Sequence, residues 1–329
     1  MLRTTILCAL LAPVLATAVR GAEPAPLVLE AKIPLGAVSG RIDHLAFDGE
    51  GQRLFVAELG NDSVGVVDLR QRQVVHRLSS LREPQGVAWH PGTATLYVAN
   101  AGDGSVRLYQ GADLGPAGRL ELGDDADNIR IDGWRSRVVV GYGKGALAVI
   151  DPATRRRIGD IALKGHPESF QFDATGARIF ANVPDAQQIA VVDAASGRQT
   201  SSLDTGRARS NFPMATDAEM RRVLVVFRNP HQLKVFDSEN GQLLANVDTC
   251  GDSDDVFVDT KRRRVYVTCG EGAIDVFSQS GNGYERIARI PTVSGARTSL
   301  FVPTIDRLYL AVRAAAGEPA AIWTFRPEP

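Results

Sequence analysis

Residues that could bind or transform a ligand recur along the chain directly before short apolar segments. The clearest example is GHPESFQF, residues 165–172, in which His166 and Glu168 precede the apolar Phe170. An imidazole can take up a proton from a substrate, and a carboxylate can bind a cation or accept hydrogen bonds. Such residues can bind or transform one ligand together only if the fold brings them close to one another.

The elements that position these residues form an internal repeat. Seven segments share a polar entrance, a short apolar strand, a turn and a second apolar strand, and they begin at residues 41, 83, 125, 166, 210, 252 and 296. The residues that open the turns are spaced by 41 to 44 positions, and they are Asp48, His90, Asp132, Asp173, Asp217, Asp259 and Pro303. Each unit continues with further strands, such as residues 63–68 and 73–78. Four short strands in a unit of this length are typical of a β-propeller blade.

The repeat predicts an all-β fold, a seven-bladed β-propeller of four-stranded antiparallel blades. The seventh unit ends with residues 321–329, which supply a third strand and leave no residues for a fourth. The strand at residues 27–35 has no unit of its own. We therefore predict that it pairs with Ile322–Phe325 and closes the ring, which also hides sheet edges that could recruit other chains.

The seven entrances are expected to meet at one mouth, because the first strand of each blade lines the central channel. The loops between the second and third strands share this entrance face. The entrance residues differ from blade to blade, whereas the turn-opening aspartate recurs and serves the turn itself. The predicted ligand-binding residues are Arg41, Asp43, His44, Asp127, Asn128, His166, Glu168, Arg209, Asn211, Asp254, Asp255 and Arg297. The alternative is that these polar groups only bind channel water and cover open strand N–H groups.

Two functions are compatible with this mouth. The first is binding of a small ligand or a protein partner without catalysis. The arginines Arg207, Arg209 and Arg297 favour a ligand that carries a carboxylate or phosphate. The second is a metal-assisted hydrolase or lyase of the lactonase kind, with His44 and His166 as bases. Its candidate oxygen ligands for Ca²⁺ or Mg²⁺ are Asp127, Asn128, Glu168, Asn211 and Asp254. Catalytic residues are not assigned, because no nucleophile with an adjacent base occurs. A scaffold that uses the blade edges is a third, weaker alternative.

Two cysteines of the sixth unit are predicted to form a disulfide. Cys250 lies at the entrance of this unit and Cys269 ends its second strand, so both belong to the same face of one blade. The chain has no Cys-x-x-Cys-His motif, which excludes covalently attached haem, and no paired Cys/His spacing indicates zinc.

The first 22 residues are predicted to be a signal peptide that precedes a single domain at residues 23–329. Arg3 is followed by an apolar run and by Ala16-Thr17-Ala18, so cleavage is expected after Ala18 or after Ala22. The apolar run is too short to span a bilayer. We therefore expect a periplasmic or secreted monomer.

The charge of the mature chain excludes an electrostatic site for nucleic acid. Removing the signal peptide takes Arg3 and Arg20 from the 37 basic residues and leaves all 38 acidic ones, so the net charge becomes −3. This balance gives no footprint for nucleic acid or for an anionic membrane. The basic run at residues 261–264 falls in a predicted turn and is expected to be a solvated tip.

The segment Tyr97-Val98-Ala99-Asn100, followed by Ser105-Val106, resembles the YVTN-repeat family of seven-bladed propellers, which includes periplasmic YncE-like proteins. The resemblance covers the mature chain. The segments GHPESFQ, NFPM, GDSDD, CGEG and GARTSLFVP further resemble one bacterial branch of that family. The resemblance implies the propeller fold and an exported protein. It leaves the function open, because propellers include binders, scaffolds and enzymes.

Overall fold

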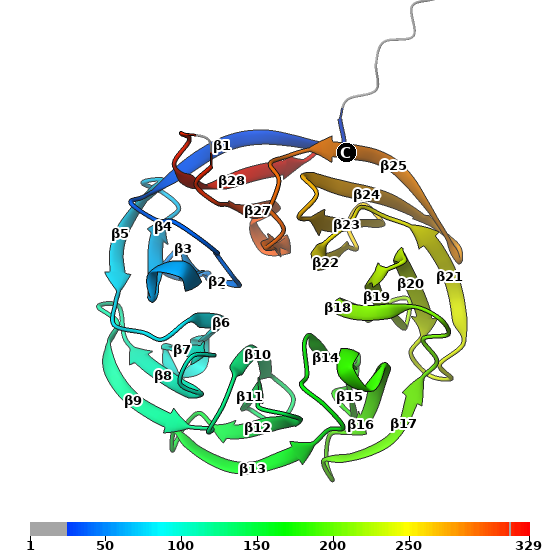
Figure 1. The fold of residues 1–329 in the computed structure, drawn as a ribbon, viewed down its shortest axis with the longest axis horizontal. Coiled ribbons are helices and arrows are strands. Elements are labelled where there is room, and N and C mark those ends of the chain that lie inside the picture. The colour runs from blue at the N-terminus through cyan, green and yellow to red at the C-terminus, as the bar shows by residue number, and fades with distance from the viewer. Residues whose placement is uncertain (1–24, 316) are drawn as a thin grey trace, which may run out of the picture.

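The computed structural model describes residues 25–315 and 317–329. The predicted signal peptide at residues 1–22, with its cleavage site, lies outside them. Viewed along its shortest axis, the described chain is a ring of radial sheets around a central axis (Figure 1). The described residues form seven four-stranded antiparallel sheets, so the predicted seven-bladed propeller is confirmed.

Blades 1 to 4 follow one another along the chain, and the strands of each run outwards from the axis (Figure 1). Blade 1 consists of β2 (Leu45–Asp48), β3 (Arg53–Glu58), β4 (Ser63–Asp68) and β5 (Gln73–Leu78). Blade 2 consists of β6 (Pro84–His90), β7 (Thr95–Asn100), β8 (Ser105–Gln110) and β9 (Gly115–Glu121). Blade 3 consists of β10 (Ala126–Asp132), β11 (Arg137–Tyr142), β12 (Ala146–Asp151) and β13 (Arg156–Ala162). Blade 4 consists of β14 (Phe170–Phe172), β15 (Arg178–Val183), β16 (Gln188–Asp193) and β17 (Arg198–Leu203).

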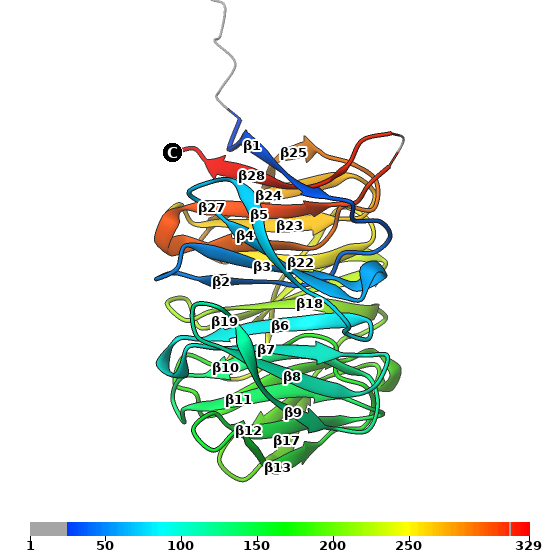
Figure 2. The ribbon, with the colours of Figure 1, turned by 90° about the vertical axis from the view of Figure 1, so that its left-hand side faces the viewer.

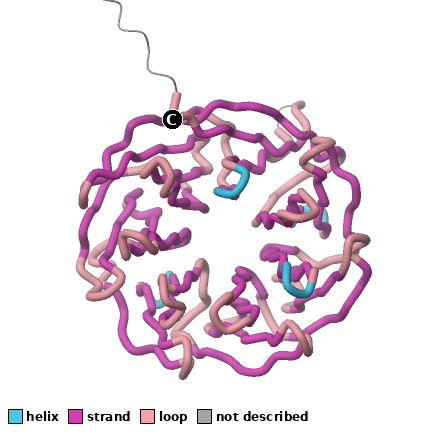
Figure 3. Tube along the Cα trace, turned by 180° about the vertical axis from the view of Figure 1, so that it is seen from behind, coloured by secondary structure: helices cyan, strands magenta, loops and turns pink. Residues whose placement is uncertain are grey.

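Blades 5 to 7 complete the ring. Blade 5 consists of β18 (Arg209–Asp217), β19 (Arg222–Asn229), β20 (His231–Asp237) and β21 (Leu243–Asp248). Blade 6 consists of β22 (Ser253–Asp259), β23 (Arg264–Cys269), β24 (Ala273–Ser280) and β25 (Gly283–Pro291). Blade 7 consists of β26 (Ser299–Val302), β27 (Arg307–Val312), β28 (Ala320–Pro327) and the N-terminal β1 (Leu27–Gly36). Among the described residues the helices are short 3-10 turns, drawn in cyan in Figure 3, namely η1 (Leu59–Asn61), η2 (Pro91–Thr93), η3 (Pro184–Ala186) and η4 (Pro303–Ile305).

The N-terminal strand closes the ring as predicted. β1 lies outermost in blade 7 and pairs antiparallel with β28, with Ile33 opposite Ile322 and Leu29 opposite Phe325. In the side view the C-terminus lies next to the beginning of β1 (Figure 2). The two ends of the described chain therefore share one blade.

The central strands are apolar along their length because neighbouring blades cover both of their faces. Leu54 and Phe55 of β3 are both fully buried. Phe55 packs in a cluster with Val98 of blade 2, whereas Leu54 packs with Tyr309 of blade 7. Burying one such side chain contributes about 1.5–3 kcal/mol, so the stacking of blades supplies most of the hydrophobic stabilisation.

A charged motif recurs on the face opposite the entrances, which we call the turn face. The aspartate at the end of the first strand, or directly after it in blade 4, pairs at 2.9 Å with the arginine that begins the second strand. The pairs are Asp48–Arg53, Asp132–Arg137 and Asp173–Arg178. The same arginine donates a hydrogen bond to a carbonyl in the outer hairpin of the following blade, and the acceptors are Ala112, Ala194 and Ser238. These charge-assisted bonds link successive blades.

The strand register corrects one detail of the repeat. Val302 pairs with Arg307 across β26 and β27 as Asp48 pairs with Arg53 across β2 and β3. Val302, rather than Pro303, therefore occupies the aspartate position in blade 7.

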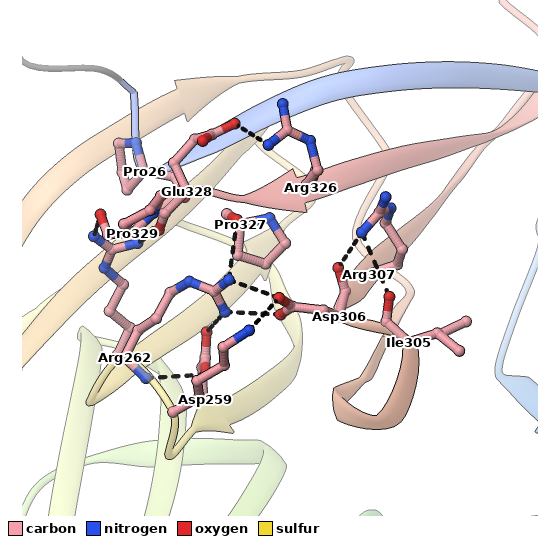
Figure 4. A network of polar contacts seen from close by, with 12 residues as sticks. Pro26, Asp259, Arg262, Ile305, Asp306, Arg307, Arg326, Pro327, Glu328 and Pro329 are labelled. Atoms are coloured by element: carbon pink, nitrogen blue, oxygen red, sulfur yellow. Dashed lines mark hydrogen bonds and ion pairs between the residues drawn. The ribbon is translucent and has the colours of Figure 1, made fainter.

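The basic run at residues 261–264 is not a solvated tip, so that expectation was wrong. Arg262 donates to both oxygens of Asp306 at 2.7 Å and to the carbonyl of Pro327 at 3.1 Å (Figure 4). Arg264 donates to the carbonyls of Glu328 and Pro329 at 2.5 and 2.9 Å. The run joins blade 6 to the terminal strands of blade 7.

In residues 25–315 and 317–329, no helix has the length and apolar character needed to cross a bilayer.

Candidate functional site

Side chains from all seven blades meet at the entrance face around a cavity of about 320 Å³, which we call the mouth. The mouth is lined by Arg41, Gln85, Asp125, Asp127, His166, Glu168, Phe212, Arg228, Asp254 and Arg297. A narrow neck of about 20 Å³ adjoins it and adds Asp43, His44, Asn128, Ser169 and Asp255. His44 and Asp255 also border a further cavity of about 340 Å³ between the inner strands.

Irregularities in four inner strands place side chains in the mouth. The register shifts lie between Pro84 and Val87, Ala126 and Ile129, Asn211 and Met214, and Ser253 and Asp255. Each shifted segment contributes one mouth residue, and these residues are Gln85, Asp127, Phe212 and Asp254. A β-bulge changes the direction of a side chain in this way, and bulges are common beside binding sites.

Gly86 permits the close contact of blades 2 and 3 at the neck. A Cβ atom at this position would lie 2.0 Å from the carbonyl oxygen of Asp127. Only glycine leaves room for that backbone. The position of Asp127 therefore depends on the absence of a side chain at residue 86.

One side of the mouth is a network of paired charges. Asp254 lies 2.5 Å from Arg228 and 3.1 Å from Arg297, and Asp252 lies 3.3 and 2.6 Å from the same two arginines. The guanidinium of Arg228 also lies 3.9 Å from the centre of the Phe212 ring. These contacts neutralise the charges and hold the side chains in fixed positions.

The other side contains carboxylates without strong partners. Asp127 is 6% exposed, and its Oδ1 has no hydrogen-bond partner among the described residues. Its nearest cationic groups are the Nε2 atoms of His44 and His166, each 3.9 Å from one of its oxygens. Glu168 forms no hydrogen bond or ion pair within the described part of the chain, although it lines both mouth and neck.

Burial raises the pKa values of three carboxyl groups in the mouth and the neck. Burial and the nearby charge of Asp127 raise the pKa of Glu168 to about 7. Burial raises the pKa of Asp43 to about 6, against the opposing effect of His44 and Arg41, and raises that of Asp255 to about 7. Carboxyl groups that titrate near neutrality are uncommon outside functional sites.

The two histidines shift toward the charged form. Burial opposes the charge of His166, but Asp127, the carbonyl of Gly143 and Asp125 outweigh it and raise the pKa to about 9. The ring Nδ1 of His166 lies 2.7 Å from that carbonyl oxygen, which accepts a hydrogen bond from it. For His44 burial is outweighed mainly by Asp43, so its pKa is also raised. The surroundings on both sides of Asp127 therefore favour the protonated form of the imidazole.

The structure brings together most of the residues predicted from the sequence. Ten of the twelve line the mouth or the neck, and they are Arg41, Asp43, His44, Asp127, Asn128, His166, Glu168, Asp254, Asp255 and Arg297. Arg209 lines neither and donates to the carbonyls of Gly206 and Ala208 in its own loop. Asn211 also lines neither, because it is buried between blades and donates to Asn182 and to the carbonyl of Gln188.

The predicted five-ligand metal set is not assembled. Asp254 is held by two arginines, and Asn211 faces away from the mouth. Across residues 25–315 and 317–329, no group of three or more His, Cys, Asp or Glu side chains is placed to hold a metal ion.

Four residues of the mouth are not among the twelve predicted ligand-binding residues, and they are Gln85, Asp125, Phe212 and Arg228. Arg228 lies at the end of β19, the second strand of blade 5, and Phe212 lies in the irregular segment of β18. Arg228 could have been predicted at the mouth, because the ends of second strands lie on the entrance face. No sequence signal fixes the direction of Phe212.

The predicted disulfide is present. Cys250 and Cys269 are joined with a Cα–Cα distance of 5.8 Å, and both are buried. The bridge connects the entrance of blade 6 to the end of β23. It thus supports the segment that carries Asp252 and Asp254.

Together, the ring of blades and its mouth define a seven-bladed β-propeller with a polar, partly desolvated site at one end of its axis. No family model and no curated protein sequence matches the chain. Among solved structures the chain is similar to Kuenenia stuttgartiensis hydrazine synthase, with 18% identity, a TM-score of 0.74, and coverage of 85% of this chain and 97% of that chain. It is also similar to a chain of the mitotic checkpoint complex, with 16% identity, a TM-score of 0.76, and coverage of 98% and 99%. At such identities the similarity is one of fold alone.

Proposed function

We propose that this propeller binds a small polar ligand in its mouth, and that a cationic or hydrogen-donating group of the ligand contacts Asp127 and Glu168. The observation that carries the proposal is the buried carboxylate of Asp127, whose Oδ1 has no hydrogen-bond partner among the described residues, beside the half-buried Glu168. Burying a polar atom without a partner costs free energy, so a ligand that supplies donors recovers that cost.

The shape and charges of the mouth favour a compact ligand. Its volume of about 320 Å³ is at the lower end of the range for small-molecule sites. Phe212 offers an apolar surface next to the arginines, while Asp127 and Glu168 provide acceptors from blades 3 and 4. A ligand with an ammonium group and a short polar body matches this distribution.

A second candidate is a hydrolase or lyase of the lactonase kind that acts in the same mouth. The observation in its favour is the position of His44 and His166 on both sides of Asp127, beside a Glu168 carboxyl whose pKa is about 7. Groups that titrate near neutrality can exchange protons with a substrate. Of the five oxygen ligands predicted for a metal ion, Asn211 lies outside the mouth and Asp254 is paired with two arginines.

We also propose that the chain is an exported YVTN-type propeller that works as a monomer in the periplasm or outside the cell. The basis is the YVTN-like segment at residues 97–100 and the signal-peptide pattern of residues 1–22. Determining the N-terminal residue of the protein recovered from a periplasmic fraction tests this. An uncleaved chain found only in the cytoplasm would contradict it.

The binding proposal is tested by a thermal-shift screen at pH 8 with small ammonium compounds, and in separate arms with CaCl₂ and MgCl₂. We expect at least one ammonium compound to give a saturable rise in Tm that Asp127→Asn removes. Asp113→Asn, at an exposed position in the β8–β9 hairpin, should keep the rise. If no ammonium compound stabilises the protein, or if both variants respond as the wild type does, the proposal fails. Stabilisation by the metal ions alone would favour the metal-dependent enzyme instead.

A further inference from the structure

The turn face contains arginine links at six junctions between neighbouring blades, within the described residues. At five of them the arginine that begins the second strand of one blade donates to the outer hairpin or chain end of the next, and these are Arg53, Arg137, Arg178, Arg222 and Arg264. At the junction of blades 2 and 3 the direction is reversed, since Arg155 donates to Gln110 and to the carbonyl of Ala117. Each link replaces solvent with a charge-assisted contact.

The seventh junction, between blades 7 and 1, differs from the others. The equivalent arginine is Arg307, but Val302 stands where five of the other six blades have aspartate. Arg307 instead binds Glu30 of its own blade at 2.6 and 3.1 Å. It also donates to the carbonyl of Asp306 at 2.8 Å (Figure 4). No hydrogen bond from Arg307 to blade 1 occurs among the described residues.

A cavity of about 220 Å³ lies at this junction. It is bordered by Arg307 of blade 7 and by Arg70 and Arg72 of the β4–β5 hairpin of blade 1, together with one acid, Glu30. Arg307 and, more weakly, Arg72 lower the pKa of Glu30, in agreement with their proximity. Three guanidinium groups against one carboxylate leave an excess of positive charge where two blades meet.

The cavity also contains an unsatisfied donor. Thr324 is 7% exposed, and its Oγ1 has no hydrogen-bond partner in the part of the chain that the structure describes. Thr324 lines the cavity together with Arg307 and the two hairpin arginines. The hydroxyl and the three guanidinium groups around this small cavity offer more donors than the single carboxylate of Glu30 can accept from.

We propose that this junction binds a small oxyanion of the phosphate type, which joins Arg307 of blade 7 to Arg70 and Arg72 of blade 1. Guanidinium groups bind phosphate oxygens through paired hydrogen bonds, and an anion between them removes their mutual repulsion. The bound anion accepts hydrogen bonds from the arginines, as a carbonyl oxygen does at most other junctions. The site lies on the turn face, opposite the mouth, and is independent of the ligand proposed there.

The test is isothermal titration of the full mature protein with sodium phosphate against NaCl of matched ionic strength at pH 7.5. We expect saturable binding of phosphate, reduced at least tenfold in the double variant Arg70→Gln/Arg72→Gln. Both arginines are exposed, so their replacement leaves the fold intact. The control is Arg198→Gln, an exposed arginine at the beginning of β17, which should bind phosphate as the wild type does.

A parallel arm with glycerol 3-phosphate distinguishes the source of the anion. Equal or tighter binding of the ester identifies a phosphorylated molecule, whereas binding of inorganic phosphate alone identifies the free ion, and both outcomes support the site. The proposal is overturned if phosphate shows no saturation in the wild type, or if the double variant and the control bind it equally.

Discussion

Replacing Glu168 by glutamine should make the unliganded protein more stable at alkaline pH. The pKa of Glu168 is raised in the fold to about 7 from an ordinary value of 4.5. The folded state therefore holds this proton more tightly than the unfolded state does. The resulting stabilisation is complete below pH 4.5 and is lost as the pH rises through 7. Glutamine keeps the size of the side chain and cannot ionise, so it avoids this loss.

The magnitude follows from the two pKa values. At about 1.4 kcal/mol for each tenfold change in proton affinity, the ionised carboxylate lowers the unfolding free energy by about 3 kcal/mol at pH 8. At pH 5 most of this stabilisation is retained, and the expected difference between variant and wild type falls to about 1 kcal/mol. For a domain of roughly 300 residues, 3 kcal/mol corresponds to about 5 °C in Tm.

The assay is thermal and urea unfolding of Glu168→Gln and wild type at pH 8 and pH 5. Glu50→Gln, an exposed residue of the β2–β3 hairpin, serves as the matched control and should change neither Tm value. The reasoning is refuted if Glu168→Gln has the wild-type Tm at pH 8, or if its gain is as large at pH 5 as at pH 8. Either result would mean that the folded protein does not disfavour the ionised carboxylate.

Two further predictions concern the support of the mouth. Replacing both Cys250 and Cys269 by alanine opens a bridge between residues 19 positions apart and should lower the unfolding free energy by about 3 kcal/mol. Urea unfolding measures this, and a loss below about 1 kcal/mol would contradict the chain-entropy argument. Gly86→Ala should lower the unfolding free energy by about 1–3 kcal/mol, because the new Cβ meets the carbonyl of Asp127. Gly133→Ala has nothing within 4 Å of its Cβ and serves as the control, so an equal Tm for both variants would count against the tight contact at the neck.

The fold of this protein could be predicted from its sequence because every blade has apolar strands whose two faces must be covered. Apolar strands such as residues 53–58 need cover on both faces, and only a neighbouring blade provides it. Strand 27–35 lacked partners in its own part of the chain, while the last unit lacked an outer strand. Pairing the two satisfied both, as the register of β1 with β28 confirms.

The side chains of the site could be predicted only in part. The sequence places residues such as Asp127 and Glu168 at the correct end of the correct strands. It does not say where a bulge turns a side chain, so Asn211 was expected in the mouth, whereas its neighbour Phe212 lines it. Arg228 enters from the end of a second strand, and its place depends on contacts with Asp254 that no local pattern encodes.

Both ends of the described chain lie in blade 7, and this determines how the molecule can be handled. The N–H of Glu328 donates to the carbonyl of Pro26 at 3.0 Å, so the C-terminus and the beginning of the described chain lie together on the turn face. A tag, tether or reporter fused to the C-terminus would stand on the side away from Asp127 and Glu168. Immobilisation through that end would leave the opposite opening free for solutes, whereas an insertion in an entrance loop would obstruct it.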